Sequence, residues 1–135
     1  MTALPKGFLR AEDERALPPL YATEDLDDRQ KVCRVKWFSG SMAWYALELD
    51  AEPDEDGRRI AFGLVVSQDC PRGEFGYFDL AELAAARVRL PYRVAGQPGV
   101  RHTAAFPAVE RDRGWFPGLT VAQVRAYIDE HGHRP

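Results

Sequence analysis

The sequence predicts a single α+β domain, an antiparallel sheet of about four strands with helices at one side and at the ends. Three observations support this. The 135 residues suffice for one domain with one core. Apolar residues make up 45% of the chain and charged residues 29%, as in globular proteins. Four short strand-like runs follow one another between residues 31 and 78, and three helical segments flank them.

The first predicted element is a helix near residues 8–17. The run FLRAEDERAL is rich in residues that favour helix. Pro18 and Pro19 end it, because the residue before a proline is pushed out of the helical region. We expect the following stretch, LPPLYATEDLDD, to be extended at first and then to form an acidic loop.

Two strands over 31–38 and 42–50 are predicted to form a hairpin. Apolar and polar residues alternate along both runs, which is the period of a strand, and Ser39 to Ser41 supply the turn. The alternation places opposite charges across the pair on a face that we expect to meet solvent. The residues concerned are Arg34 and Lys36 on one strand and Glu48 and Asp50 on the other.

Four aromatic residues surround this turn. Trp37 and Tyr45 lie on the apolar sides of their strands, and we expect both in the core. Phe38 and Trp44 fall on the other sides. Exposed, they would offer a protein partner a binding site together with Tyr21 of the LPPLY segment; covered by that segment, they would form a second small core. The sequence leaves both interpretations open.

Strands over 59–67 and 74–78 come next, followed by a helix over 79–87. The run IAFGLVV is almost continuously apolar, as in a central strand, and EFGYF is a short aromatic strand. Asp79 and Glu82 have the spacing of a helix capping box.

The remainder of the chain divides into an irregular segment and a helix. Residues 90–118 are rich in proline and glycine, so we expect loop there, with one or two short strands in VRLPYRV or TAAFPAV. The last helix is predicted over 120–131, because Thr120 and Gln123 form a second capping box and Gly132 is a typical stop.

Charge is distributed unevenly along the chain. Residues 1–86 hold 10 Lys or Arg against 17 Asp or Glu, whereas residues 87–135 hold 8 against 4. The two parts are therefore expected to attract one another, or the later part to face an anionic partner.

The later part contains a candidate site for nucleic acid or another anion. Six arginines lie within 27 residues and are interleaved with aromatic rings. Guanidinium groups pair with phosphates and rings stack on bases, so this composition suits nucleic-acid binding. The alternative is that the arginines neutralise the acidic part of the same molecule, which the overall pI of about 5.6 favours. The candidates are Arg87, Arg89, Arg93, Arg101, Arg111, Arg113, Tyr92 and Trp115.

No catalytic or metal-binding signature is present, so no cofactor and no metal are expected. The acidic run 50–57 lacks the glycine and glutamate of a calcium loop, and the three histidines, at 102, 131 and 133, have no zinc spacing. A small enzyme around Cys70 and His102, with Asp69, stays as a third hypothesis.

The sequence also bears on localisation. No run approaches the roughly 18 apolar residues of a membrane span, and the start lacks the pattern of an export signal. We therefore expect a cytoplasmic protein with no membrane contact. Cys33 and Cys70 are expected to be free thiols.

Four blocks of the chain stand out, namely LPPLYATED (17–25), VKWFSGSMAWYALELD (35–50), FGLVVSQDCPRGEFGYFDLAEL (62–83) and ERDRGWFPG (110–118). In this order they resemble the successive blocks of the DUF2958 family of small bacterial and phage proteins of unknown function. The resemblance implies a family-like core over 14–118 and an appended helix over 119–131. The chain departs from the family at the acidic stretch 52–56 and in the long 91–109 segment.

The resemblance implies an accessory protein of a mobile genetic element, such as a plasmid, integrative element or phage, without catalytic residues. With the acidic first part of the chain, it favours a non-enzymatic, anti-defence or regulatory factor that binds a host or element-encoded protein. The alternative is a nucleic-acid-binding module that uses residues 87–113. The oligomeric state is left open.

Overall fold

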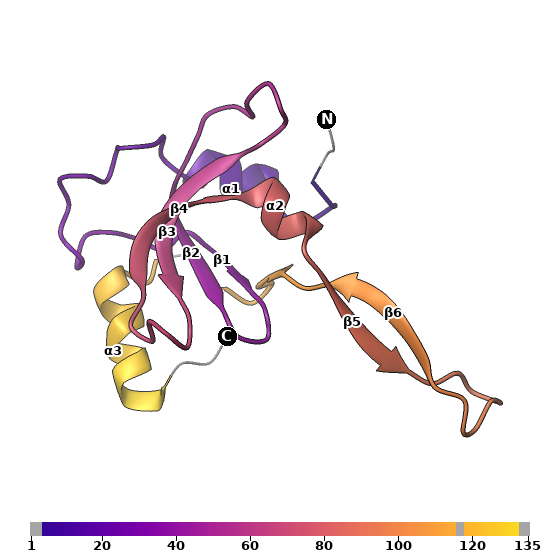
Figure 1. Cartoon of the computed structure of the whole chain (residues 1–135). Helices are drawn as coiled ribbons and strands as arrows, with labels where there is room; N and C mark the ends of the chain where they lie inside the picture. Colours follow the sequence, from indigo (N-terminus) through magenta and orange to yellow (C-terminus); the bar gives the residue numbers. More distant parts are fainter. Residues whose placement is uncertain (1–3, 116–117, 133–135) are drawn as a thin grey trace.

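A five-stranded antiparallel sheet forms the centre of the molecule, and a two-stranded hairpin projects from it (Figure 1). The structure, a computed structural model, describes residues 4–115 and 118–132. The sheet has the strand order β4-β3-β2-β1-β7, and β5 and β6 form the hairpin. In chain order the elements are α1 (Ala11–Ala16), β1 (Val35–Phe38), β2 (Ala43–Leu49), β3 (Ile60–Val66), β4 (Glu74–Asp79), α2 (Leu80–Ala85), β5 (Arg87–Tyr92), β6 (His102–Pro107), β7 (Glu110–Arg111) and α3 (Val121–His131).

The predicted α+β class is confirmed, and the four expected strands and three helices are all present. The capping box of Thr120 and Gln123 at the start of α3 is confirmed. Asp79 caps α2 by accepting a hydrogen bond from the Ala81 N–H, but the predicted reciprocal bond from Glu82 is not formed. The first strand is shorter than expected. It begins at Val35, because the backbone before it pairs with the start of α3: the Cys33 N–H donates to the Leu119 carbonyl.

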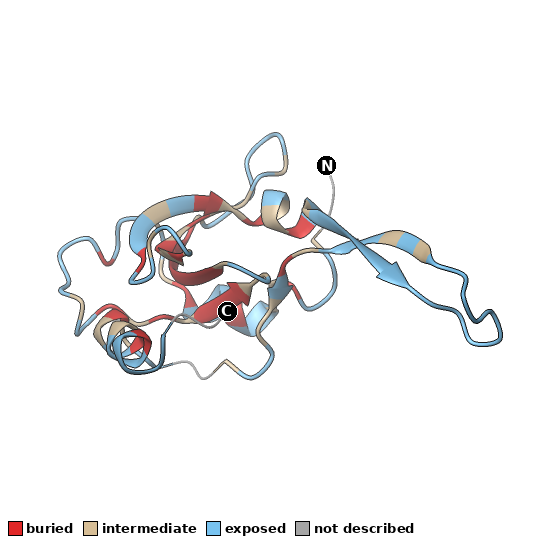
Figure 2. Cartoon of the chain, turned by 60° about the horizontal axis from the view of Figure 1, so that its bottom comes forward, coloured by how far each residue is buried: buried red, intermediate tan, exposed pale blue. Residues whose placement is uncertain are grey.

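Both faces of the sheet are buried over β1 and β2, whereas β4 is largely exposed (Figure 2). One face packs with the N-terminal segment and α2 around Trp37, which contacts the Phe8 and Phe78 rings at centroid distances of 5.9 and 6.2 Å. The other face packs against α3 through Val121, Val124 and Ile128. The C-terminal helix therefore supplies one wall of a core.

The solvent-facing side expected for the first hairpin does not exist. Lys36 lies opposite Tyr45 and Glu48 lies opposite Phe62, and both charged residues are buried. The predicted charge pairs between these strands are therefore wrong. The prediction failed because it assumed that one face of the hairpin meets solvent, whereas α3 and the segment before β1 cover that face.

Residues 87–107, here called the arm, stand outside this packing. Neither core cluster includes any of them, and nearly all are exposed (Figure 2). One or two short strands were expected in this region, and the structure has two, which pair with each other over six residue positions. The remainder of the molecule is here called the body.

Two further findings concern the described part of the chain. It contains no helix with the length and apolar character needed to cross a membrane. Cys33 is buried and Cys70 half-buried, and both are free thiols, as expected.

Candidate functional site

The arm concentrates positive charge. It holds four of the chain's 18 Lys and Arg residues and none of its 21 Asp and Glu residues. The rest of the chain therefore has a formal charge of -7. None of the four arginines forms an ion pair with a carboxylate in the part of the chain that the structure describes. The arm thus presents uncompensated cations on a slender projection of an acidic body.

The two sides of the arm differ in chemistry. Arg87, Arg89 and Thr103 share one side, and the Arg89 guanidinium donates a hydrogen bond of 3.0 Å to the Thr103 hydroxyl. Residues of the other side are apolar and aromatic. Their exposed fractions lie between 38% and 45% for Val88, Leu90, Tyr92 and Phe106.

Two more arginines lie beyond the last paired position. That position joins Tyr92 to His102, whose rings stack with centroids 5.2 Å apart. Arg93 follows Tyr92 and Arg101 precedes His102, and both are exposed. Cations therefore continue from the base of the arm toward its tip.

A basic hollow lies where the arm joins the body. It has a volume of about 310 Å³, and one acidic residue, Glu110, lines it. Two of the predicted arginines, Arg87 and Arg113, are exposed at this hollow. Two further cations there had no local signal in the sequence, because Lys6 and Arg10 come from the start of the chain and join the site only through the fold.

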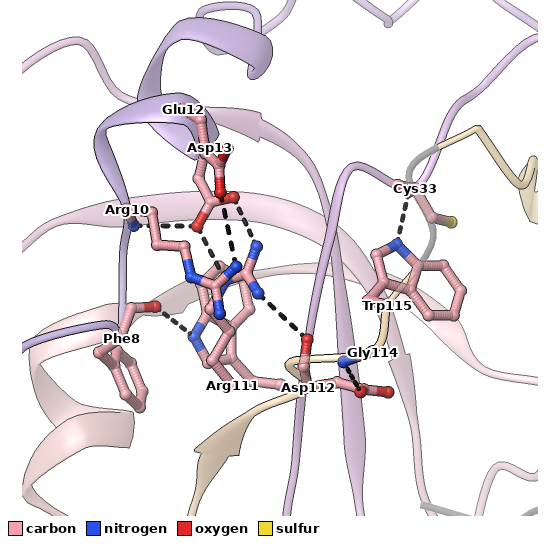
Figure 3. A network of polar contacts seen from close by, with 10 residues as sticks. Phe8, Arg10, Glu12, Asp13, Cys33, Arg111, Asp112, Gly114 and Trp115 are labelled. Atoms are coloured by element: carbon pink, nitrogen blue, oxygen red, sulfur yellow. Dashed lines mark hydrogen bonds and ion pairs between the residues drawn. The ribbon is translucent and has the colours of Figure 1, made fainter.

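Arg111 also lines this hollow, but its charge is neutralised by an ion pair within the protein. Its guanidinium binds both carboxylate oxygens of Asp13, at 2.8 and 2.6 Å, and both side chains are buried (Figure 3). The same carboxylate accepts the Arg10 N–H at 2.9 Å. This network ties the segment after the arm to α1, so Arg111 has a structural role.

Trp115 likewise belongs to the body. Its indole N–H donates to the Cys33 carbonyl at 2.9 Å (Figure 3). Its ring meets that of Tyr45 edge-on, with centroids 5.3 Å apart. It is half-buried against the core on the α3 face. The ring is therefore not a free platform for a base.

The three residues expected to form one protein-binding site are separated. Trp44 lies opposite Trp37 on the same face of the sheet and is buried. Phe38 is half-buried and lines a shallow groove of about 800 Å³ with Val88 and Leu90 of the arm. Tyr21 is 64% exposed and lies near the edge of β4.

A hollow of about 260 Å³ lies between α3 and the sheet. The Lys36 ammonium sits over the Tyr45 and Trp115 rings there and is 3.8 Å from an Asp112 oxygen. Burial lowers the pKa of Lys36, and Asp112 opposes that shift. Burial raises the pKa of Tyr45 to about 12.

The structure does not bring the residues of the enzyme hypothesis together. Cys70 lies in the loop between β3 and β4, whereas His102 lies on the arm, on the far side of the body in Figure 1. The His102 ring is 3.1 Å from the Gln97 side chain. Burial raises the pKa of the other thiol, Cys33, to about 12, which disfavours its thiolate.

Residues 4–115 and 118–132 contain no group of three His, Cys, Asp or Glu side chains placed to hold a metal ion. His133 lies outside the described residues.

No protein-family model, curated protein or solved structure matches the chain. The resemblance to the DUF2958 family therefore gains no support from these comparisons and stays a proposal.

Proposed function

We propose that the protein binds nucleic acid, and specifically duplex DNA, through the arm. The observation that carries the proposal is the pairing of charge with shape: four exposed arginines without any acidic residue, on a two-stranded ribbon that projects from an acidic body. Phosphate contacts by arginine supply most of the affinity of sequence-independent binding.

The dimensions of the arm suit a DNA groove. Each strand has six residues, or about 20 Å at the usual rise per residue. The major groove of B-DNA, about 12 Å wide, admits a two-stranded ribbon, whereas the deep groove of duplex RNA is too narrow for side chains to read. DNA-binding proteins also insert apolar side chains between base pairs, and the exposed Phe106 is a side chain of this kind.

Charge would orient the encounter. The body has a formal charge of -7 and is repelled by phosphates, while the arm is attracted. The basic hollow at the arm's base, with Arg87 and Arg113, extends the cationic track toward the body. The protein would therefore approach DNA with the arm first.

Salt-titrated binding tests this proposal. We expect a labelled 20-base-pair duplex to bind with a log–log salt slope of about -0.9 for each phosphate contacted. Replacing Arg93 and Arg101 together with alanine should weaken binding and reduce the slope by the share of about two phosphate contacts. Replacing the same two residues with lysine keeps both charges and should preserve most of the slope. Fluorescence anisotropy at several salt concentrations provides the measurement.

Arg29→Ala is the matched control, because it removes one exposed cation from the acidic loop of the body. It should leave the slope unchanged. Failure of the wild-type protein to bind either the duplex or its single strand would rule out nucleic-acid binding. Tighter binding of the single strand would rule out the groove geometry.

Protein binding remains as a second candidate function, favoured by the charge of the body and by exposed aromatic residues at one sheet edge. In this proposal the chain is a cytoplasmic, non-enzymatic accessory factor that binds a host or element-encoded protein. Its assignment to a mobile genetic element rests on the family resemblance alone.

A further inference from the structure

One edge of the sheet is free. Among the described residues, β4 pairs with β3 and with no other strand, and the pairing runs over six positions without a bulge. Edge strands of natural proteins are usually interrupted by proline, lysine or a bulge, which prevent another strand from adding. The run EFGYFD of β4 has none of these.

The backbone of this edge faces outward at two aromatic positions. The Leu80 N–H donates to the Arg59 carbonyl, so the alternation of an antiparallel ladder directs the groups of Phe78 and Gly76 toward β3. The N–H and C=O groups of Phe75 and Tyr77 therefore point away from the sheet. Within the described part of the chain, no hydrogen bond is formed by these outward backbone groups of Phe75 and Tyr77.

Aromatic side chains cover the sheet surface next to this edge. The Phe62 ring lies 6.0 Å from that of Phe75 and 4.9 Å from that of Tyr77. Tyr77 is 55% exposed and Tyr21 is 64% exposed. Partial loss of water contact raises the pKa of Tyr77, and the neighbouring Tyr21 is the next cause. These four residues are here called the edge patch.

A buried carboxylate holds Tyr21 in this exposed place. Glu48 accepts the Tyr21 N–H at 2.7 Å and the Thr23 N–H at 2.9 Å, and the Thr23 hydroxyl also donates to it. Tyr21 has φ of 74°, which makes it the one residue other than glycine with positive φ among those described. Such strain persists only where surrounding contacts enforce it, and it is frequent at binding sites.

The surroundings of the edge patch are acidic on the solvent side. Glu24 is exposed there and contributes to the raised pKa of Tyr77. Glu74 is also exposed, but it lies on the opposite face of β4, because successive residues of a strand alternate between the two faces. The nearest cations, Lys31 and Arg125, sit over the Phe75 ring and already have partners in the body. A ligand of the patch thus gains from apolar side chains and from positive charge.

We infer that β4 is a docking edge for an extended segment of a partner protein in which apolar and basic residues alternate. The segment would add as a sixth strand, its backbone pairing with Phe75 and Tyr77. Alternate apolar side chains would pack on the edge patch, and the lysines or arginines between them would point to the opposite face of the sheet, where Glu74 is exposed. The inference rests on the protein-binding alternative and is independent of the arm.

Selection from a displayed library of random eight-residue peptides tests this inference. We expect the enriched peptides to alternate apolar and basic residues. Binding of the best synthetic peptide should weaken at least tenfold in Tyr77→Lys, which removes a ring and repels cations. Tyr127→Lys is the matched control on α3, where the tyrosine is 57% exposed, and it should change binding less than twofold.

Hydrogen exchange distinguishes strand addition from contact by side chains alone. The outward amides of Phe75 and Tyr77 should exchange rapidly in the free protein and become protected in the complex. Arm variants such as Arg93→Ala should leave peptide binding intact, so failure of DNA binding and failure of this inference are separate results.

Three outcomes would overturn the inference. The first is the absence of enriched peptides, or equal loss of binding in both lysine variants. The second is protection confined to residues outside β4. The third is self-association that rises with protein concentration and is abolished by Tyr77→Lys, since a second copy would then occupy the edge.

Discussion

Asp13 and Arg111 illustrate how single residues fix the position of the arm. They are 98 positions apart, yet their two hydrogen bonds fasten the segment after the arm to the N-terminal helix. No sequence pattern indicated this pair, because α1 and β7 are each short and acquire their contact only in the fold. Arg111 therefore counted among the binding candidates although its charge is neutralised internally.

Removing one partner of this pair should be costly. Arg111→Ala leaves the Asp13 carboxylate buried without its counter-ion, and such losses amount to about 3–5 kcal/mol of unfolding free energy. Urea denaturation measures the change. Arg113→Ala, two positions along and exposed, is the control and should cost less than about 0.5 kcal/mol. A comparably small loss in Arg111→Ala would contradict a buried, structurally important pair.

At the scale of elements, predictions succeeded where the signal was local. The capping residues Asp79 and Thr120 and the alternation of the first strands are encoded in a few neighbouring positions, and those elements are present. The burial of Lys36 and Glu48 depends on α3 and on the loop before β1, which pack over them from distant parts of the chain. Which side of a strand meets solvent is a property of its neighbours, so alternation alone misassigned it.

Two glycines that lie opposite one another in the sheet should respond differently to substitution. A Cβ at Gly63 would lie 1.8 Å from the Tyr45 carbonyl oxygen, whereas one at Gly76 would meet nothing within 4 Å. We expect Gly63→Ala to cost more than about 2 kcal/mol, because the backbone of β2 cannot move aside. Gly76→Ala should be neutral or stabilise by up to about 1 kcal/mol.

Urea denaturation of both glycine variants checks this difference. Equal effects would show that β2 and β3 approach one another less closely than the structure indicates.

At the scale of the whole molecule, the fold class and the order of the helices and the sheet strands could be predicted from the sequence. The separation in space of the predicted nucleic-acid-binding residues could not. Arg87, Arg89, Arg93 and Arg101 lie on the arm, while Trp115 lies against a core. Proline and glycine in residues 90–118 predicted mostly loop with one or two short strands, and the structure joins two such strands into a hairpin of six paired positions. The run RVRLPY does alternate, but it is short and contains Pro91, which argues against a strand, and no local pattern indicates that it pairs with a run ten residues further along.

The arm should be dispensable for folding. We predict that joining Val88 to Phe106 through an Asn-Gly turn preserves the thermal unfolding temperature to within a few degrees, because neither core includes residues 87–107. The same variant should lose the salt-dependent binding of duplex DNA. Circular dichroism and anisotropy measure the two results. A large fall in the unfolding temperature would show that the arm contributes to the body's stability.

The separation of arm and cores also has an evolutionary consequence. Most substitutions in a protein are constrained by the stability they cost, but changes at exposed positions of the arm, such as Arg93 or Val94, lie outside that constraint. The arm can therefore diverge quickly, lengthen or acquire a new specificity while the body stays the same. Descendants of this chain would be expected to share a conserved body and to differ most in the ribbon.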